Sequence, residues 1–127
     1  MSQSTYTSLN QYNTTKAPLL GDLSAIYQSI ENIIETSPGE RLFNPEFGSF
    51  IENYLFDPLD EITAMKIETE LIKAIGRWEQ RVYILNQFTR ATPNHNSNSY
   101  DIKIVFRVRG IENQVFDYNA SLVRKNL

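Results

Sequence analysis

The chain has 127 residues, of which 41% are hydrophobic and 21% are charged, as in a single soluble domain with a core of its own. Its formal charge of -3 excludes the broad basic surface that holds a protein on nucleic acid phosphates. Cysteine is absent and His95 is the single histidine, which excludes disulfide frameworks, thiolate zinc sites, thiol nucleophiles and histidine metal clusters. No apolar run approaches the roughly 20 residues that span a bilayer, and residues 1–16 lack the apolar core of a signal peptide. We therefore expect a protein made in a cytoplasm, used there or packaged from it, with no cofactor and no membrane or nucleic acid partner.

Residues 1–18 are predicted to form a polar arm, and residues 19–127 a single domain. Ser, Thr, Asn and Gln dominate the first sixteen residues, with the aromatic side chains of Tyr6 and Tyr12 among them. Such a composition buries too little area to offset its ordering entropy. The arm is therefore either disordered or ordered only against a neighbouring subunit, with the tyrosines as anchors.

Helical periodicity is clear beyond Asp22. Apolar residues recur at helical spacing at Leu23, Ile26, Tyr27, Ile30, Ile33 and Ile34. We predict Asp22 as the N-cap, because its carboxylate can accept the unpaired amide hydrogens of a first turn. The helix should end before Pro38, where Gly39 completes the break.

Aromatic residues crowd the segment from Glu40 to Asp57. Pro45 and Gly48 predict a structured loop through Gly48, followed by a short helix from about residue 49 to residue 55. A longer helix should start between Asp60 and Thr63 and run to about Trp78. Its apolar face is predicted to carry Ile67, Leu71, Ile75 and Trp78.

The period changes to strand-like alternation beyond residue 80, which predicts three strands at 81–89, 100–109 and 114–122. In the second strand the apolar face carries Ile102, Ile104, Phe106 and Val108, and the polar face carries Asp101, Lys103, Arg107 and Arg109. The polar run 91–99 is predicted as a loop and residues 110–113 as a turn. The predicted class is α+β, with two to three helices packed on one face of a small three-stranded, mainly antiparallel sheet. The edges of such a sheet offer unpaired backbone groups to another chain unless something covers them.

Residues 39–48 give the pattern G-x-R-x-F-x-P-x-F-G directly before the short helix. Leu-Phe-Asp follows at 55–57, Thr-Ala at 63–64 and Trp-Glu-Gln-Arg at 78–81. In this order, from about Leu19 to Leu122, the chain resembles the gene-25-like baseplate wedge family of contractile phage tails. That family also carries the label GPW or lysozyme-like and has relatives in type VI secretion baseplates. The family usually shows Glu-Pro-Arg at the positions of residues 79–81, and this chain has Gln80 in place of the proline. The turn therefore lacks the φ restraint that proline would supply, and we expect Glu79 and Arg81 to keep its shape.

The resemblance implies a structural, non-enzymatic virion component of the baseplate wedge, assembled in the host cytoplasm. The implied partners are other wedge proteins, which form a helical core bundle, and the tail sheath protein, with tail tube or hub-proximal proteins as further candidates. The small sheet would start sheath assembly by accepting an extended sheath arm as an added strand. The sequence leaves open which strand edge accepts it, and whether the source is a phage or a phage-derived secretion device.

Six residues are predicted to contact partners: Arg41, Phe43, Phe47, Glu79, Gln80 and Arg81. In the loop, Phe43 and Phe47 can pin the chain onto the helices, and Arg41 offers a fork of donors. Gly39 and Gly48 permit positive φ at its turns. The loop either only closes the core or is part of a docking surface. Glu79 and Arg81 form either an ordinary surface ion pair, worth about 0–1 kcal/mol, or the contact with the helical bundle that the resemblance implies.

The alternative function is a peptidoglycan-degrading, lysozyme-like glycoside hydrolase. Its mechanism needs a carboxylic acid of raised pKa and a second carboxylate about 5 to 9.5 Å away. The available carboxylates are Glu46, Glu52, Asp57 and Glu61, with Glu52 as the candidate acid. Their spacing marks no pair, and serine–histidine catalysis would depend on His95 in a polar loop. We therefore predict that the chain is not an enzyme.

Overall fold

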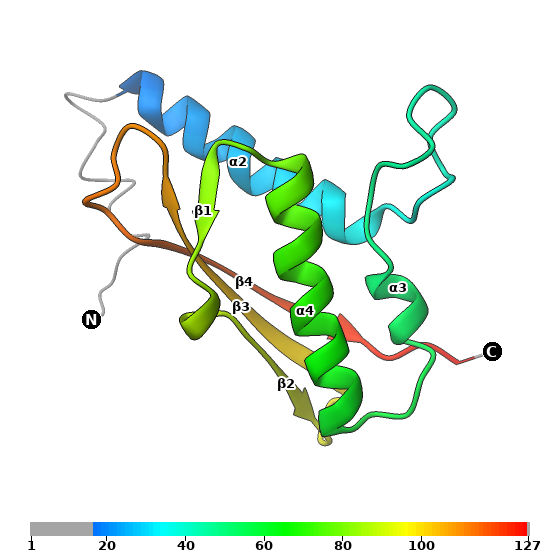
Figure 1. Ribbon diagram of the computed structural model, residues 1–127. Helices are drawn as coiled ribbons and strands as arrows, with labels where there is room; N and C mark the ends of the chain where they lie inside the picture. The colour runs from blue at the N-terminus through cyan, green and yellow to red at the C-terminus, as the bar shows by residue number, and fades with distance from the viewer. Residues whose placement is uncertain (1–16, 127) are drawn as a thin grey trace.

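The computed structural model describes residues 17–126, with side chains from residue 21 onward (Figure 1). Its helices are α2 (Ala17–Glu35), α3 (Ile51–Tyr54) and α4 (Glu61–Trp78). Its strands are β1 (Val82–Ile84), β2 (Arg90–Asn94), β3 (Ser99–Val108) and β4 (Phe116–Val123), with a short 3-10 turn η1 (Asn86–Phe88) between β1 and β2. The predicted α+β class is confirmed. Residues 1–16 of the predicted arm lie outside the described part of the chain, while residues 17 and 18 belong to α2.

Helix α2 begins earlier than predicted, so the assignment of Asp22 as its N-cap is wrong. Asp22 lies five residues inside the helix. Pro18 is compatible with this start, because proline is tolerated in the first turn, where its missing amide has no intrahelical partner. The predicted apolar face is confirmed: Leu23, Ile26 and Ile30 are fully buried.

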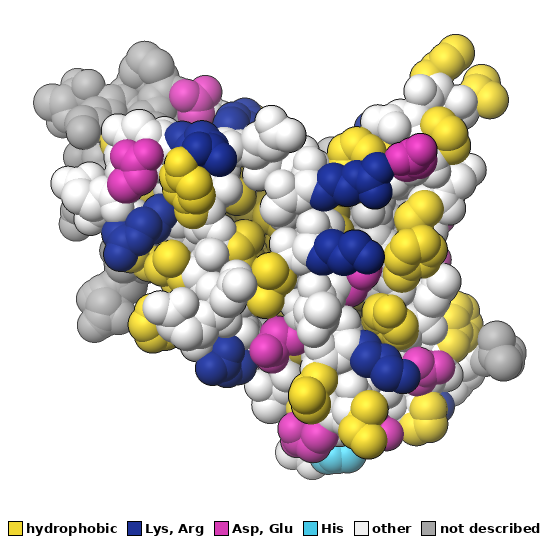
Figure 2. All heavy atoms as spheres, in the orientation of Figure 1, with side chains coloured by type: hydrophobic (Ala, Val, Ile, Leu, Met, Phe, Trp, Pro, Cys, Tyr) yellow, Lys and Arg dark blue, Asp and Glu magenta, His cyan; other side chains and the backbone are white. Residues whose placement is uncertain are grey.

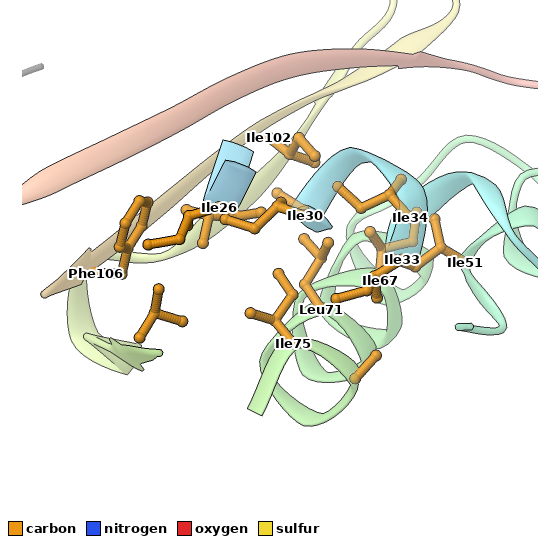
Figure 3. Close-up of a cluster of buried hydrophobic side chains, with 14 of the residues drawn as sticks. Ile26, Ile30, Ile33, Ile34, Ile51, Ile67, Leu71, Ile75, Ile102 and Phe106 are labelled. Atoms are coloured by element: carbon orange, nitrogen blue, oxygen red, sulfur yellow. The ribbon is translucent and has the colours of Figure 1, made fainter. Parts of the chain in front are cut away.

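Helix α4 begins and ends where the sequence indicates. The Asp60 side chain accepts a hydrogen bond of 2.8 Å from the Thr63 amide and so caps the first turn. Ile67, Leu71 and Ile75 are fully buried against α2 and the sheet, in the cluster drawn in Figure 3. Helix α3 is shorter than predicted and places Ile51 in the same cluster.

The sheet is antiparallel and is organised around β3. Strand β4 pairs with one side of β3 from Ser99↔Val123 to Phe106↔Phe116. Strands β1 and β2 follow one another along the other side. Along β3, side chains alternate as predicted, with the apolar face buried against the helices and Asp101 and Lys103 exposed on the other face.

The prediction of three strands is wrong in one region, because the sheet has four. The predicted strand 81–89 is split into β1 and η1, and the polar run predicted as a loop contains β2. Strand β2 pairs with β3 from Arg90↔Lys103 to Asn94↔Ser99, which leaves a turn of only residues 95–98. Ladder hydrogen bonds join backbone groups, so an edge strand with polar side chains gives no hydrophobic signal in the sequence. None of the helices in residues 17–126 is long and apolar enough to cross a membrane.

Candidate functional site

The turn between α4 and β1 is built around the carboxylate of Glu79, whose side chain is 5% exposed. Its Oε1 accepts hydrogen bonds from the Arg81 amide (3.0 Å) and Nε (2.8 Å), and its Oε2 accepts one from Nη2 (2.7 Å). The Arg81 side chain itself is 47% exposed. A two-point pair of this kind fixes orientation as well as distance. The predicted pair therefore forms, with its carboxylate buried and part of the guanidinium left at the surface.

Electrostatics keep this pair ionised. Burial raises the pKa of Glu79, but hydrogen bonds from the Arg81 side chain, Ser29 and the Arg81 amide outweigh burial and leave that pKa below its ordinary value. The hydrogen bond to Glu79 raises the pKa of Arg81 in turn. Gln80 is exposed, and its carbonyl accepts a hydrogen bond from Arg109 Nε, while the Arg109 amide donates to the Arg81 carbonyl at 2.8 Å. These bonds hold the turn without a proline.

The loop between α2 and α3 is tied to the end of α2. Gly39 and Gly48 have φ values of 98° and 120°, so the predicted positive φ is confirmed at both. A Cβ added at Gly48 would lie 2.2 Å from the carbonyl oxygen of Thr36. Next to it, the Ser49 amide donates to that same carbonyl at 2.9 Å, and the Ser49 hydroxyl donates to the Ile33 carbonyl at 3.0 Å. Only glycine fits this close approach of two backbones.

Phe47 packs this loop onto α4, whereas Phe43 does not. The Phe47 ring lies 5.2 Å from the Trp78 ring between centroids, and the Arg41 guanidinium lies 3.9 Å from the Phe47 centroid. A hydrogen bond from the Gly39 amide to the Pro45 carbonyl (2.6 Å) closes the neck of the loop and leaves residues 40–44 as its tip.

The prediction that Phe43 pins the loop is wrong, because Phe43 lies in this tip and is 95% exposed, beside Leu42 at 85%. Figure 2 shows apolar side chains at the end of the loop, standing clear of the body. The positive φ values of Gly39 and Gly48 make the backbone turn sharply on either side of the tip. The tip therefore projects away from the helices, and Phe43 does not pack on them.

Trp78 connects the loop to the α4–β1 turn. It precedes Glu79 in the chain and packs against Phe47, and the Arg77 guanidinium lies 4.7 Å from its ring centroid. Arg77 also forms a salt bridge of 2.6 Å with Glu46 of the loop. Loop and helix together border a cavity of about 330 Å³. Of the six predicted residues, Arg41 and Phe47 thus connect through Trp78 to the segment 79–81, and Phe43 lies apart from them.

The sheet edge formed by β1 and β2 is interrupted and partly occupied. Hydrogen-bonded and non-bonded pairs alternate along an antiparallel ladder, and the Leu85 amide donates to the Val105 carbonyl at 2.8 Å. With the observed register, the backbones of Ala91 and Pro93 therefore point away from β3. The Ala91 amide donates a hydrogen bond of 3.1 Å to Glu68 Oε2, and Pro93 has no amide hydrogen. The turn η1 also interrupts this edge.

The outer edge of β4 is not paired with any strand in residues 17–126. The Arg124 amide donates to the Asn98 carbonyl at 2.9 Å, which sets the phase of the β3–β4 ladder. Amides and carbonyls then point away from β3 at Asp117, Asn119, Ser121 and Val123. Within residues 17–126, no recorded hydrogen bond uses these outward backbone groups. Strand β4 is regular over eight residues, so its edge can pair with one further strand.

Two of the four carboxylates considered for glycoside hydrolysis pair with cations, whereas no salt bridge to Asp57 or Glu61 is found among residues 17–126. Glu52 Oε2 lies 2.8 Å from Lys125 Nζ, and Glu46 is the partner of Arg77. The part of the chain that the structure describes also contains no group of three His, Asp or Glu residues able to hold a metal ion.

The roles of three residues at the α4–β1 turn and the β1–β2 edge were not predicted from the sequence. Arg109 was assigned only to the wet face of the sheet, yet it bonds to Gln80 and donates to the Tyr83 hydroxyl. Pro93 gave a usable signal, since proline within a strand is typical of an edge. The contact of Glu68 with the Ala91 amide has no sequence signal, because it joins two elements that only the fold brings together.

Comparisons with known proteins agree with this geometry. Residues 22–112, more than two thirds of the chain, match the family described as baseplate wedge protein gp25. The baseplate wedge protein gp25 of Enterobacteria phage T4 is 35% identical over 60 residues, which span 47% of this chain and 46% of that protein, a little under half of each. A Geobacter sulfurreducens protein described as a candidate tail lysozyme superposes with a TM-score of 0.74 at 29% identity, over 83% of this chain and 93% of its own. A chain of the post-contraction pyocin R2 baseplate superposes with a TM-score of 0.58 at 25% identity, over 68% of this chain and 85% of its own.

The family match includes the aromatic loop, the α4–β1 turn and the central strand β3. It agrees with the resemblance that the motifs at 39–48 and 78–81 indicate. The chain belongs to the baseplate wedge protein gp25 family.

Proposed function

We propose that this chain is a structural subunit of a contractile-tail baseplate in which β4 accepts an extended arm of a sheath subunit as an added strand. Sheath assembly would then begin on the baseplate, in the host cytoplasm, and the particle would carry the subunit afterwards. Main-chain hydrogen bonds would determine the geometry of this joint largely independently of side-chain identity.

The proposal rests on the difference between the free backbone groups at the two edges of the sheet. On the β1–β2 side, Pro93 lacks an amide hydrogen, Glu68 occupies the Ala91 amide, and η1 interrupts the edge. On the β4 side, four residues in alternate positions leave both amide and carbonyl without a partner among the described residues. Soluble proteins usually protect their edges, so one long regular edge left open favours a strand-accepting role.

We further propose that the loop and the α4–β1 turn join this subunit to the helical bundle of other wedge proteins. The tip offers two apolar side chains, Leu42 and Phe43, that contribute nothing to the core. At the turn, Arg81 keeps a partly exposed guanidinium that Glu79 orients. Exposed apolar anchors and oriented arginine side chains are both typical of protein interfaces.

The strand-addition proposal is tested by substitution of Asn119, whose amide points outward from β4. Asn119→Pro removes that amide hydrogen but no bond of the β3–β4 ladder, so the domain should stay folded. Asn119→Ala is the matched control, because it removes the same side chain, including its contact with Asp117, and keeps the amide.

In a contractile-particle assembly assay scored by electron microscopy, Asn119→Pro should give baseplates and tubes without sheath, and Asn119→Ala should give sheathed tails. Melting curves of both purified variants provide the folding control. Sheathed tails at normal yield from a folded Asn119→Pro protein would refute β4 as the accepting edge.

A further inference from the structure

Helix α2 runs alongside β4 and brings carboxylates to its open side. Tyr27, Glu31 and Glu35 are four residues apart and therefore share one face of the helix. At one end of this face, the Tyr27 ring lies 6.3 Å from the Tyr118 ring between centroids. At the other end, Glu35 and Leu122 line one cavity. Eight helix residues cover about 12 Å and four strand residues about 13 Å, so Glu31 and Glu35 follow β4 along its length.

Within residues 17–126, the side chains of Glu31 and Glu35 form no hydrogen bond and no salt bridge. Both lie in the last two turns of α2, where the helix dipole favours cations, and the last turn contains no basic residue. Burial, followed by the charges of Glu31 and Glu35, raises the pKa of the Tyr118 hydroxyl, in agreement with their position beside β4. The carboxylates therefore cost local stability and remain available to a partner.

A cavity of about 230 Å³ opens at the Val123 end of the same edge. The apolar part of its lining comes from Ile34, Ile51, Leu55, Leu122 and Val123, and the rest from Glu35, Glu52, Ser121 and Lys125. A cavity of about 150 Å³ is enough to hold benzene, so this one has room for one large side chain against its apolar part. Leu122 belongs to the core face of β4, so the cavity lies on the side of the edge toward which the inward side chains of an added strand would point.

We infer that the strand accepted by β4 is a segment of another polypeptide with a large apolar side chain at the Leu122 position, followed by a basic side chain at the next inward position. Tyr27 packs on Tyr118 and Glu35 lines the cavity with Leu122, so Glu31, between them on α2, lies beside that next position, at Ala120. The inference rests on the proposed function, since it describes the ligand of the same edge.

The test uses the full chain with a probe strand tethered to its C-terminus through a flexible Gly/Ser linker of about ten residues. Such a linker spans roughly 17 Å and keeps the probe at about millimolar effective concentration. In the first probe, threonine alternates with one leucine and then one lysine, starting from the linker. The second probe has glutamate in place of the lysine, and the third has alanine in place of the leucine. Amide exchange at Asn119 and Ser121, measured by NMR, reports docking on the edge.

The lysine–leucine probe should slow exchange at these amides about tenfold more than either altered probe. The variant Glu31→Gln/Glu35→Gln should remove most of the advantage of lysine over glutamate. The variant Glu40→Gln/Glu61→Gln is the charge-matched control, because it removes two exposed carboxylates that are not on the α2 face beside β4. It should keep the advantage of lysine over glutamate.

The outcomes separate the inference from the function on which it rests. Equal protection by all three probes would leave strand addition standing and overturn the charge and cavity preference. Protection that depends on lysine but not on leucine would overturn the assignment of the cavity. A failure of every probe to protect the edge would refute β4 as a strand acceptor, and both proposals with it.

Discussion

Replacement of Gly48 by alanine should destabilise the domain far more than the same change at Gly39. Both glycines have positive φ, at 120° and 98°, so both alanines incur backbone strain of about 1–2 kcal/mol. At Gly39 the new Cβ meets nothing within 4 Å. At Gly48 it would lie 2.2 Å from the Thr36 carbonyl oxygen, closer than real Cβ contacts come, and the obstacle is backbone. The loop must therefore move away from α2.

Relief of that contact weakens bonds that the loop makes to α2. The Ser49 amide bonds to the same Thr36 carbonyl, and the Ser49 hydroxyl bonds to Ile33. Overpacking of this kind costs about 1–3 kcal/mol. With the strain, Gly48→Ala should lower the free energy of unfolding by about 2–5 kcal/mol, and the melting temperature by about 10 °C or more.

Calorimetric melting and urea unfolding of Gly48→Ala, Gly39→Ala and the parent chain measure the difference. Gly39→Ala isolates the strain, so subtraction of its effect leaves the cost of the steric contact. If the two variants melt within about 2 °C of one another, the contact between Gly48 and Thr36 does not fix the loop, and the argument for a rigidly placed docking surface fails.

Three further predictions follow from single contacts. The pKa of Glu79 is lower in the folded than in the unfolded chain, so its stabilising contribution is present above its ordinary pKa of 4.5 and is lost as the pH falls through the folded value. The loss of stability in Glu79→Gln, measured by urea unfolding, should therefore be largest near neutral pH and shrink as the pH falls below 4.5, and a constant difference would contradict the pairing with Arg81. Asp60→Ala removes the cap on the Thr63 amide and should cost about 1 kcal/mol, whereas Asp60→Asn should recover most of it in the same melting assay. Phe43→Ser should leave the melting temperature within about 1 °C, because the side chain is 95% exposed, but should reduce co-purification with wedge proteins; undiminished co-purification would remove Phe43 from the interface.

The helices could be predicted from the sequence because their periodicity reports burial directly. Ile67, Leu71 and Ile75 recur at helical spacing, and all three are fully buried. The start of α2 could not be predicted in the same way, since Pro18 allows a helix to begin earlier than its first apolar repeat. Strand β2 was missed for a related reason: its ladder joins backbones, while its side chains remain polar.

The candidate site was predictable where chemistry is local. Glu79 and Arg81 are two residues apart, so a carboxylate and a guanidinium at that spacing readily meet at a turn. The exposure of Phe43 could not be predicted from its neighbours in the sequence, because it depends on the direction that the loop takes after its turns at Gly39 and Gly48. The choice of the accepting edge depended on the phase of two ladders and on the reach of Glu68 from α4, which no spacing in the sequence encodes.

The central claim is that another polypeptide completes this sheet at β4. The most direct measurement is an electron cryomicroscopy structure of the extended particle that contains this chain, at a resolution that traces backbone around β4. The account predicts a foreign strand hydrogen-bonded to the outward amides and carbonyls of Asp117, Asn119, Ser121 and Val123. A β4 edge that faces solvent in the assembled particle, or a sheath arm bound elsewhere on the subunit, would contradict it.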